Sequence, residues 1–249
     1  MLSEQRKTHL LELLRRDGRV VAKTVAADLG ISEDSIRRDL RELAEAGLAR
    51  RVYGGALPMD AAEVPFAERG EVEPASKARV ARAALVLIEP GMTIALDAGT
   101  TSMAIARILP RGARLTIATP SPHVAIAAAE HSDARVVLLG GELGRHSMVS
   151  GGALALEAIS RIGADRLLLG ASGVHPDHGV TTDDPDDAAV KRALAAASRE
   201  TYLVVSSEKL GARAQHPVLS LDDLAGLVVD PADRDDLDPR LRHYAVPDA

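Results

Sequence analysis

Apolar residues recur at helical spacing through the first 46 residues of the chain. The pattern predicts a first helix that stops at Asp17 and Gly18, and a second, shorter helix over residues 21–29. Gly30 can end this second helix because glycine adopts positive φ at little cost. Ser32 is positioned to cap a third helix over residues 33–46, which Gly47 ends. The alternating stretch 48–57, with its pair of glycines, predicts a small β-hairpin.

The pattern changes after this hairpin. Residues 58–75 combine prolines, a glycine and several acids with little periodicity, which is typical of a linker. Beyond them, short apolar runs are bounded by turn residues and separated by helical stretches; they cover residues 92–96, 115–118, 136–139, 167–169 and 202–205. Such runs indicate a parallel sheet covered on both faces. We therefore predict a mostly parallel-sheet α/β domain over residues 76–249.

Composition narrows the possible functions. Hydrophobic residues make up 46% and charged residues 27%, as in ordinary globular proteins, but aromatic residues only 2%. So few aromatic residues argue against recognition by base stacking, which is common in proteins that bind RNA or single-stranded DNA. The absence of cysteine excludes thiolate metal sites and fits a reducing cytoplasm, where we expect the protein. No apolar run approaches the roughly 20 residues that span a bilayer.

Charge is distributed unevenly along the chain. The formal net charge is −6, yet residues 1–58 carry 11 Lys and Arg against 9 Asp and Glu, while the remainder is strongly acidic. A basic head on an acidic body is compatible with a nucleic-acid-binding N-terminal segment.

The third predicted helix separates apolar residues from arginines. At about 100° per residue, its apolar side chains share one stripe, and Arg37, Arg38 and Arg41 gather on another side. If the stripe packs on the first two helices, the arginines face outward. An outward arginine face on the last helix of a trihelical unit suits a DNA major groove, where arginine bonds guanine edges or phosphates.

Neighbouring residues extend this candidate surface. Ser32 and Ser35 can donate to phosphates, and Arg50 and Arg51 in the hairpin can reach the flanking backbone or the minor groove. The alternative is a solvated charged helix face, on which the arginines pair with the acids of the same helix, Asp34, Asp39 and Glu42.

A specific string decides between these alternatives. Residues 30–43 read Gly-Ile-Ser-Glu-Asp-Ser-Ile-Arg-Arg-Asp-Leu-Arg-Glu-Leu and are followed by Arg51-Val52-Tyr53-Gly54-Gly55-Ala56. The whole N-terminal segment closely resembles the DeoR family of transcription regulators, with its recognition helix and wing. The resemblance implies a winged helix-turn-helix over residues 1–57 that binds double-stranded operator DNA, with its helix-turn-helix at about 20–46 and a wing at about 48–57. It also implies that the wing backbone at Gly54 and Gly55 contacts DNA. Tyr53 departs from the histidine of many members.

The clearest candidate ligand site follows the first apolar run of the second half. Asp97-Ala98-Gly99-Thr100-Thr101-Ser102 joins this run to a helical stretch over residues 103–109. Such a turn presents backbone N–H groups, two hydroxyls and the positive end of a helix dipole, which suits a phosphate. The alternative is an ordinary turn with threonine as N-cap, because the loop is neither a Walker A nor a dinucleotide motif.

Further candidates follow the other strands, since ligands bind outside the carboxyl ends of parallel strands. Three turns qualify, Thr119-Pro120-Ser121, Gly140-Gly141-Glu142 and Gly170-Ala171-Ser172-Gly173. Two lysines join them, Lys191 on a helix and Lys209 after the last long strand. A glycine after a strand is also routine turn chemistry, but together these residues mark one edge of the sheet.

This half also looks like the effector domain of the DeoR family, which is related in fold to ribose-5-phosphate isomerase. The matching motifs are Asp97-x-Gly99-Thr100-Thr101, Gly140-Gly141, Gly151, Gly170-x-Ser172-Gly173, Gly179-x-Thr181, Lys191 and Ser207-x-Lys209-x-Gly211. The resemblance implies a phosphorylated sugar or related metabolite as effector, with Gly99, Thr100 and Thr101 as its phosphate cradle. Lys77, which we place before the first helix of this domain, also matches the family. Pro120, Asp187 and Ser206 depart from the usual Asn, Glu and Asp.

Two other functions have some support. An isomerase or deaminase needs a carboxylate base and a partner acid, for which Asp97, Asp183 or Asp187 near Lys191 would serve. A metal-responsive regulator is suggested by His175-Pro176-Asp177-His178, with Asp183 and Asp184 nearby. We favour neither, and expect no catalysis, no cofactor and no bound metal.

The resemblance implies a repressor of a carbohydrate-metabolism operon. We expect a dimer or tetramer that contacts two or more operator half-sites. For the effector to regulate DNA binding, it needs only to bind the DNA-competent and DNA-incompetent states with different affinities.

Overall fold

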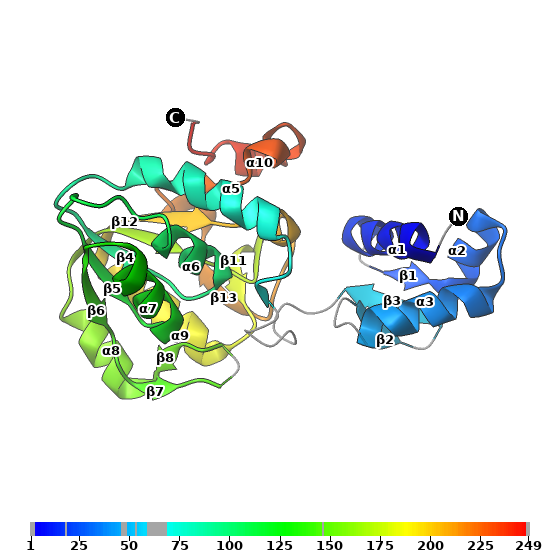
Figure 1. The fold of residues 1–249 in the computed structure, drawn as a ribbon, viewed down its shortest axis with the longest axis horizontal. Helices are drawn as coiled ribbons and strands as arrows, with labels where there is room; N and C mark the ends of the chain where they lie inside the picture. Colours follow the sequence, from blue (N-terminus) through cyan, green and yellow to red (C-terminus); the bar gives the residue numbers. More distant parts are fainter. Residues whose placement is uncertain are drawn as a thin grey trace. The chain divides into compact units, whose positions relative to one another are not determined.

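The structure is a computed structural model that describes residues 3–17, 19–45, 49–52, 54–58, 69–145 and 147–247. It comprises two compact units, Met1–Val64 and Pro65–Ala249, and the division falls within the segment 58–75 (Figure 1). Most of that segment, residues 59–68, lies outside the described residues, as do Gly18, the predicted helix end at Ala46 to Leu48, and Tyr53.

The first unit is the predicted winged helix-turn-helix. Its elements are α1 (Ser3–Asp17), β1 (Val20–Val21), α2 (Ala22–Leu29), α3 (Glu33–Glu45), β2 (Ala49–Val52) and β3 (Gly55–Pro58). The three strands form an antiparallel sheet in the order β1-β3-β2, in which β2 and β3 are the predicted hairpin. The strand β1 was not predicted, because a two-residue strand has no periodicity of its own.

Helix α3 packs against the rest of this unit through the predicted apolar stripe. Ile36, Leu40 and Leu43 are each at most 3% exposed and share a core with Leu10 and Leu14 of α1. Burying one such side chain contributes about 2 kcal/mol. The turn before α3 also forms as predicted: Gly30 ends α2 at a φ of 64°, and the Ser35 N–H donates to the Ser32 side chain at 3.3 Å, which confirms Ser32 as the N-cap.

The second unit is built on a six-stranded sheet whose neighbouring strands are all parallel. Its order is β14-β12-β9-β4-β5-β6. The strands span Thr93–Leu96 (β4), Thr116–Thr119 (β5), Arg135–Leu138 (β6), Ala164–Leu169 (β9), Ser198–Val204 (β12) and Gly226–Val228 (β14). The five predicted apolar runs lie in or overlap the first five of these strands, so the predicted parallel α/β sheet is confirmed; β14 was not predicted.

Helices cover both faces of this sheet (Figure 1). One face packs on α5 (Pro74–Ala84), α6 (Thr100–Ala106) and α7 (Pro122–His131), and α5 continues into η1 (Leu85–Leu87). The other face packs on α8 (Gly152–Ser160), α9 (Pro185–Ala196) and the smaller sheet described next. Both α5 and α6 begin earlier than predicted.

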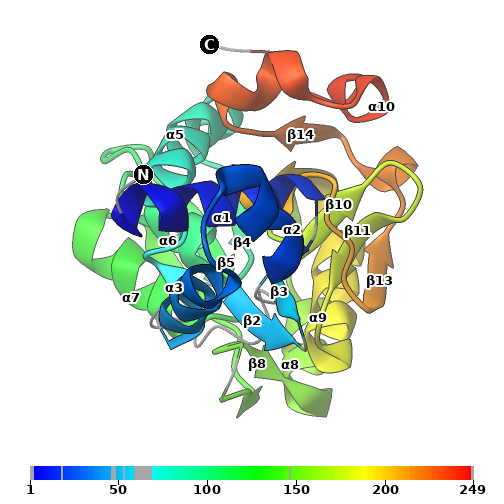
Figure 2. The ribbon, with the colours of Figure 1, turned by 90° about the vertical axis from the view of Figure 1, so that its right-hand side faces the viewer.

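Two small antiparallel sheets complete the unit. The strands β10 (Gly173–His175), β11 (Gly179–Thr182) and β13 (His216–Leu219) lie side by side, as Figure 2 shows. The strands β7 (Glu142–Leu143) and β8 (Ser150–Gly151) pair separately. The remaining elements are η2 (Ser207–Lys209), η3 (Leu221–Asp223), η4 (Pro231–Asp236) and α10 (Pro239–Arg242). Among the described residues, no helix is both long and apolar enough to cross a membrane.

The strand order creates one preferred position for a ligand. From β4 the chain proceeds outward to β5 and β6, then returns to β9 on the other side of β4. Connections leave β4 and β9 in opposite directions, which opens a crevice at their carboxyl ends. Asp97 immediately follows β4, and Gly170 immediately follows β9.

Candidate functional site

The arginines of α3 project away from the core of the first unit. Arg37, Arg38 and Arg41 are all exposed, whereas the apolar side of the same helix is buried. This is the placement that the helical periodicity predicts, and it leaves long cationic side chains on one solvent-facing surface.

The acids of α3 are largely engaged elsewhere. Asp39 is buried and accepts a hydrogen bond from Nη2 of Arg6 on α1 at 3.0 Å. The ammonium of Lys7, which also lies on α1, is 3.1 Å from the carboxylate of Glu42. Arg37 pairs with Glu33 one turn earlier. Within the described residues, Arg38 and Arg41 form no ion pair. Helix α1 thus binds two of the acids that would have neutralised the surface.

The remaining DNA-binding candidates surround this helix face. The hydroxyls of Ser32 and Ser35 lie 2.9 Å apart at the N-terminus of α3. Arg51 is exposed on β2; Arg50 lies on the same strand, but its side chain is outside the described part. Gly54 forms the hairpin tip at a φ of 81°.

The second glycine of the wing has a structural role. A Cβ on Gly55 would lie 1.9 Å from the carbonyl oxygen of Val20, with which its strand pairs. Glycine is therefore required here for β3 to approach β1, whether or not the wing contacts DNA.

In the second unit, a buried charge cluster lies at the carboxyl end of β4. The ammonium of Lys191 on α9 donates to Oδ2 of Asp97, which also accepts from the N–H of Gly170 at 2.9 Å. Asp187, one turn before Lys191, places Oδ2 3.5 Å from the same ammonium. Burial opposes the charge of Lys191, but the carboxylates of Asp187 and Asp97 outweigh it and raise the pKa of the ammonium above its usual value.

The predicted phosphate cradle leads directly into α6. Gly99 is the N-cap at a φ of 118°, with open space where a side chain would begin, and Thr100 and Thr101 lie in the first turn of the helix. The alternative of threonine as N-cap is therefore wrong. The hydroxyls of Thr101 and Ser102 are buried, and in the described part of the chain neither has a hydrogen-bond partner; the same holds for Asp97 Oδ1. Buried polar atoms without partners are uncommon away from ligand or water sites.

Two further lysines belong to this region. Lys209, in η2 after β12, is half buried, and within the described residues its ammonium makes no hydrogen bond or ion pair. Burial, and then the neighbouring Lys191 and Arg69, lower its pKa, against the effect of Glu208. Lys77 is the fourth residue of α5, so its predicted position before the first helix is wrong: α5 already begins at Pro74.

Arg69 was not identified from the sequence. It lies in the Pro- and Gly-containing segment assigned to the linker, and its carbonyl accepts a hydrogen bond from the ammonium of Lys77 at 2.5 Å. Burial lowers the pKa of its guanidinium, which the carboxylates of Asp183 and Asp187 oppose. The one sign of Arg69 that the sequence offers is a basic residue within a segment that has no hydrophobic periodicity.

Three predicted glycines receive different explanations. A Cβ on Gly141 would meet the carbonyl oxygen of Gly151 at 2.4 Å, and one on Gly173 the carbonyl oxygen of Ala212 at 2.5 Å. Close backbone packing explains both residues without a ligand. Gly140 is exposed, with open space around its missing Cβ.

The three residues that depart from the family pattern, Pro120, Asp187 and Ser206, each make hydrogen bonds to nearby residues. The Pro120 carbonyl accepts from the Ser150 N–H at 2.8 Å, which links β5 to β8. The shorter Asp187 still reaches Lys191 and also accepts from the Thr182 hydroxyl at 2.6 Å. Ser206 is buried and donates to Glu208 at 2.8 Å.

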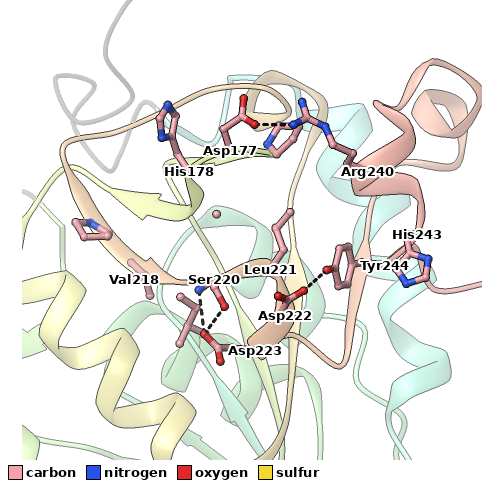
Figure 3. A pocket seen from close by; sticks show the side chains of 14 residues that line it. Asp177, His178, Val218, Ser220, Leu221, Asp222, Asp223, Arg240, His243 and Tyr244 are labelled. Carbon is pink, nitrogen blue, oxygen red and sulfur yellow. Dashed lines mark hydrogen bonds and ion pairs between the residues drawn. The ribbon is translucent and has the colours of Figure 1, made fainter.

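A pocket of ≈ 860 Å³ lies elsewhere in this unit, between the β10–β11 turn, β13, η3 and α10. Figure 3 shows Arg240 bonded to Asp177 on one side of it, and Tyr244 bonded to Asp222 on the other. None of the charge-cluster residues lines it. His175 and His178 stack at 4.9 Å, but within the described residues no three His, Asp or Glu side chains gather as metal ligands would.

Comparison with known proteins identifies both units. Residues 6–61 match the profile of the DeoR-like helix-turn-helix domain, and residues 72–231 match that of the DeoR C terminal sensor domain. The chain belongs to the DeoR family. Among relatives of this DeoR-family chain, the glycerol-3-phosphate regulon repressor of Escherichia coli K12 is 34% identical, covering 86% of this chain and 85% of that protein. The HTH-type transcriptional regulator GlpR of Haloferax volcanii is 33% identical, covering 92% and 91%.

Among solved structures, ribose 5-phosphate isomerase A from Methanocaldococcus jannaschii is 19% identical to this DeoR-family chain at a TM-score of 0.40. The match covers 54% of this chain and 53% of the isomerase.

Proposed function

We propose that this DeoR-family regulator represses transcription by binding double-stranded operator DNA through α3 and the wing, and that a phosphorylated sugar, polyol or related metabolite modulates this binding from the second unit. On the DNA side, Arg38 and Arg41 support the proposal, because both are exposed and form no ion pair within the described residues. Helix α1 binds Asp39 and Glu42, two of the acids that could have neutralised this surface, which favours contact of these guanidinium groups with phosphates or guanine edges.

On the effector side, one observation carries the proposal: the half-buried ammonium of Lys209 has no partner within the described residues. It lies at the carboxyl edge of the sheet, where the buried hydroxyls of Thr101 and Ser102 also make no hydrogen bond to any described residue. A phosphate ester supplies both an anion for the lysine and acceptors for the hydroxyls. Lys77 and the backbone at Gly99 are expected to contribute to the same site.

A thermal-shift screen tests this part of the proposal. Glycerol 3-phosphate and ribose 5-phosphate are compared with glycerol and ribose, because a ligand at about 100 times its Kd stabilises the folded protein by ~2.7 kcal/mol. We expect the esters alone to raise the melting temperature, and Lys209→Met to abolish the effect. Arg107→Met, which removes an exposed charge at the far end of α6, should preserve it. Equal shifts with the unphosphorylated compounds would refute a phosphate site.

We propose that the second unit binds its effector without converting it. Asp97, one of the carboxylates suggested as base or acid of an isomerase, already accepts through Oδ2 from Lys191 and from the Gly170 N–H. Incubation with ribose 5-phosphate should yield no product; robust turnover would favour an enzyme.

We further propose a dimer or tetramer as the DNA-binding form. Several leucines of the second unit are exposed: Leu138 on the edge strand β6, Leu143 on β7 and Leu154 on α8. Leu154 is 70% exposed, and α8 contacts β7, so Leu154 and Leu143 lie on neighbouring elements that could form an apolar interface. Light scattering should detect an oligomer that Leu154→Glu weakens; a monomer at micromolar concentration would contradict the proposal.

A further inference from the structure

The first described residues of the second unit, 69–73, fold back on its first helix, α5. The described chain resumes at Arg69, and Glu73 adopts a φ of 47° before Pro74 opens α5. Positive φ is unfavourable for a residue with a side chain, so the surrounding contacts must hold this turn. One of those contacts is the hydrogen bond from the Lys77 ammonium to the Arg69 carbonyl at 2.5 Å. The same carbonyl accepts from the Val72 N–H at 3.3 Å, so Lys77 adds a side-chain contact to a turn that the backbone also closes.

The same segment is attached to the turn that carries Lys209. Ser76 on α5 places its hydroxyl 2.9 Å from the Ser207 hydroxyl, and it also accepts from the Ser207 N–H at 3.2 Å. Ser207 is the first residue of η2, and Lys209 is the last. Ser76 thus ties the first turn of α5, where Lys77 lies, to the turn that carries Lys209.

Lys77 has an unusual partner for a buried ammonium. Its side chain is 5% exposed, and within the described residues it contacts a neutral carbonyl and forms no ion pair with a carboxylate. Burial lowers its pKa to about 8; Glu208 opposes this shift, whereas Lys209 and Arg69 add to it. A carbonyl compensates a buried charge less well than an anion does. An anion that reached this position would compete with the Arg69 carbonyl for the ammonium.

We propose that the Lys77–Arg69 contact is a latch that couples the effector site to DNA binding: a phosphate group bound beside Lys209 draws the Lys77 ammonium from the Arg69 carbonyl and releases residues 69–73. This inference rests on the proposed function, that a phosphorylated effector binds at this edge of the sheet.

The latch also gives the effector response a direction. With the contact closed, the backbone of residues 69–73 is held in one conformation; with the contact open, this segment gains conformational freedom that DNA binding must remove. The open form should bind DNA more weakly. By reciprocity, DNA binding should weaken effector binding by the same factor. Lys77 is thus a positioning residue for DNA binding, although it lies in the other unit.

The decisive test needs no effector. DNA selected by the wild-type protein from a random duplex pool is titrated with full-length wild type, Lys77→Met and Lys77→Arg. Lys77→Met removes the donor and should weaken DNA binding about tenfold, a typical allosteric factor. Lys77→Arg retains a cationic donor and should restore much of the affinity. Arg82→Met removes an exposed charge from the same helix and should leave the affinity unchanged.

Hydrogen exchange distinguishes release of the latch from a general loss of stability. Amides of residues 69–73 should exchange faster in Lys77→Met, and also in wild type on addition of glycerol 3-phosphate or inorganic phosphate, while those of β4 and β9 keep their protection. A folded Lys77→Met protein with wild-type DNA affinity would overturn the latch. Should that variant not fold, Lys77→Gln replaces it and is judged by the same criteria.

The latch and the proposed function fail in different ways. If no phosphate ester stabilises the protein, the proposed effector class is wrong. If esters bind but the exchange of residues 69–73 is unchanged and Lys77→Met binds DNA normally, the latch alone is wrong.

Discussion

The ammonium of Lys191 on α9 bonds to Asp97 at the end of β4, a residue 94 positions earlier in the chain. Both side chains are nearly inaccessible to solvent. With Asp187 one helical turn away, the contact holds α9 over the carboxyl end of the central strand. The charged pair therefore has a structural role in the sheet edge that the proposed effector site occupies.

Removing one member of this pair should strongly destabilise the second unit. Lys191→Met leaves two buried carboxylates without their cation, and breaking a buried pair costs about 3 kcal/mol or more. Urea unfolding should show this loss. The matched control is Arg161→Met, which breaks the exposed pair with Glu157 and should cost ~0–1 kcal/mol. Similar losses for both variants would mean that the Lys191 pair is no more important than a surface pair.

Arg38→Ala should weaken binding to selected DNA by about tenfold or more, since one arginine contact to a base or phosphate contributes roughly 1–3 kcal/mol. Fluorescence anisotropy at fixed salt measures the loss, and stabilisation by phosphate esters should persist. Arg161→Ala removes an exposed arginine in the other unit and serves as the control. Unchanged affinity for Arg38→Ala would remove α3 from the proposed DNA surface.

The elements that could be predicted from the sequence are those in which burial leaves a recognisable pattern of apolar residues. Strands such as β9 are buried on both faces and appear as apolar runs, and the stripe containing Ile36 and Leu40 appears at helical spacing. Strand β14 was missed because it has three residues and begins with Gly226, where a Cβ would lie 2.7 Å from Val246. Its glycine reflects packing against a distant residue.

The candidate effector site was only partly predictable for a similar reason. Because parallel strands end at one edge of a sheet, the positions of Asp97 and Lys209 after their strands predict that the two residues share that edge. Arg69 and Lys77 join them only through tertiary contacts, since the hydrogen bond between them depends on the turn at Glu73. Residue types in an aperiodic segment do not encode such a turn visibly.

The two wing glycines should respond differently to substitution. Gly55→Ala forces a methyl group onto the Val20 carbonyl and should destabilise the β1–β3 pairing by about 2 kcal/mol. Gly54→Asn should be tolerated, because asparagine accepts positive φ and the position is open. Hydrogen exchange of residues 20–21 and 55–58, with DNA affinity alongside, measures both effects. Intact protection in Gly55→Ala would show that β1 shifts to make room.

Effector affinity should decrease as the pH rises through about 8, because Lys77 has a pKa of about 8 instead of its usual 10.5. Binding of a phosphate dianion favours the ammonium form. Below pH 8 that form is already present, so Lys77 contributes no pH dependence; above pH 8 the lysine must take up a proton to bind. Affinity should then fall by up to about tenfold per pH unit, until the pKa of the bound state is reached.

Calorimetry of glycerol 3-phosphate binding in buffers of different ionisation enthalpy measures this proton uptake directly. The second ionisation of a phosphate ester has a pKa of about 6, so the ester is a constant dianion over the window from pH 7.5 to 9.5. Burial also lowers the pKa of Lys209, so part of the pH dependence should remain in Lys77→Met. The difference between the two proteins isolates Lys77. Identical proton uptake at pH 8.5 in both would show that this ammonium does not meet the phosphate.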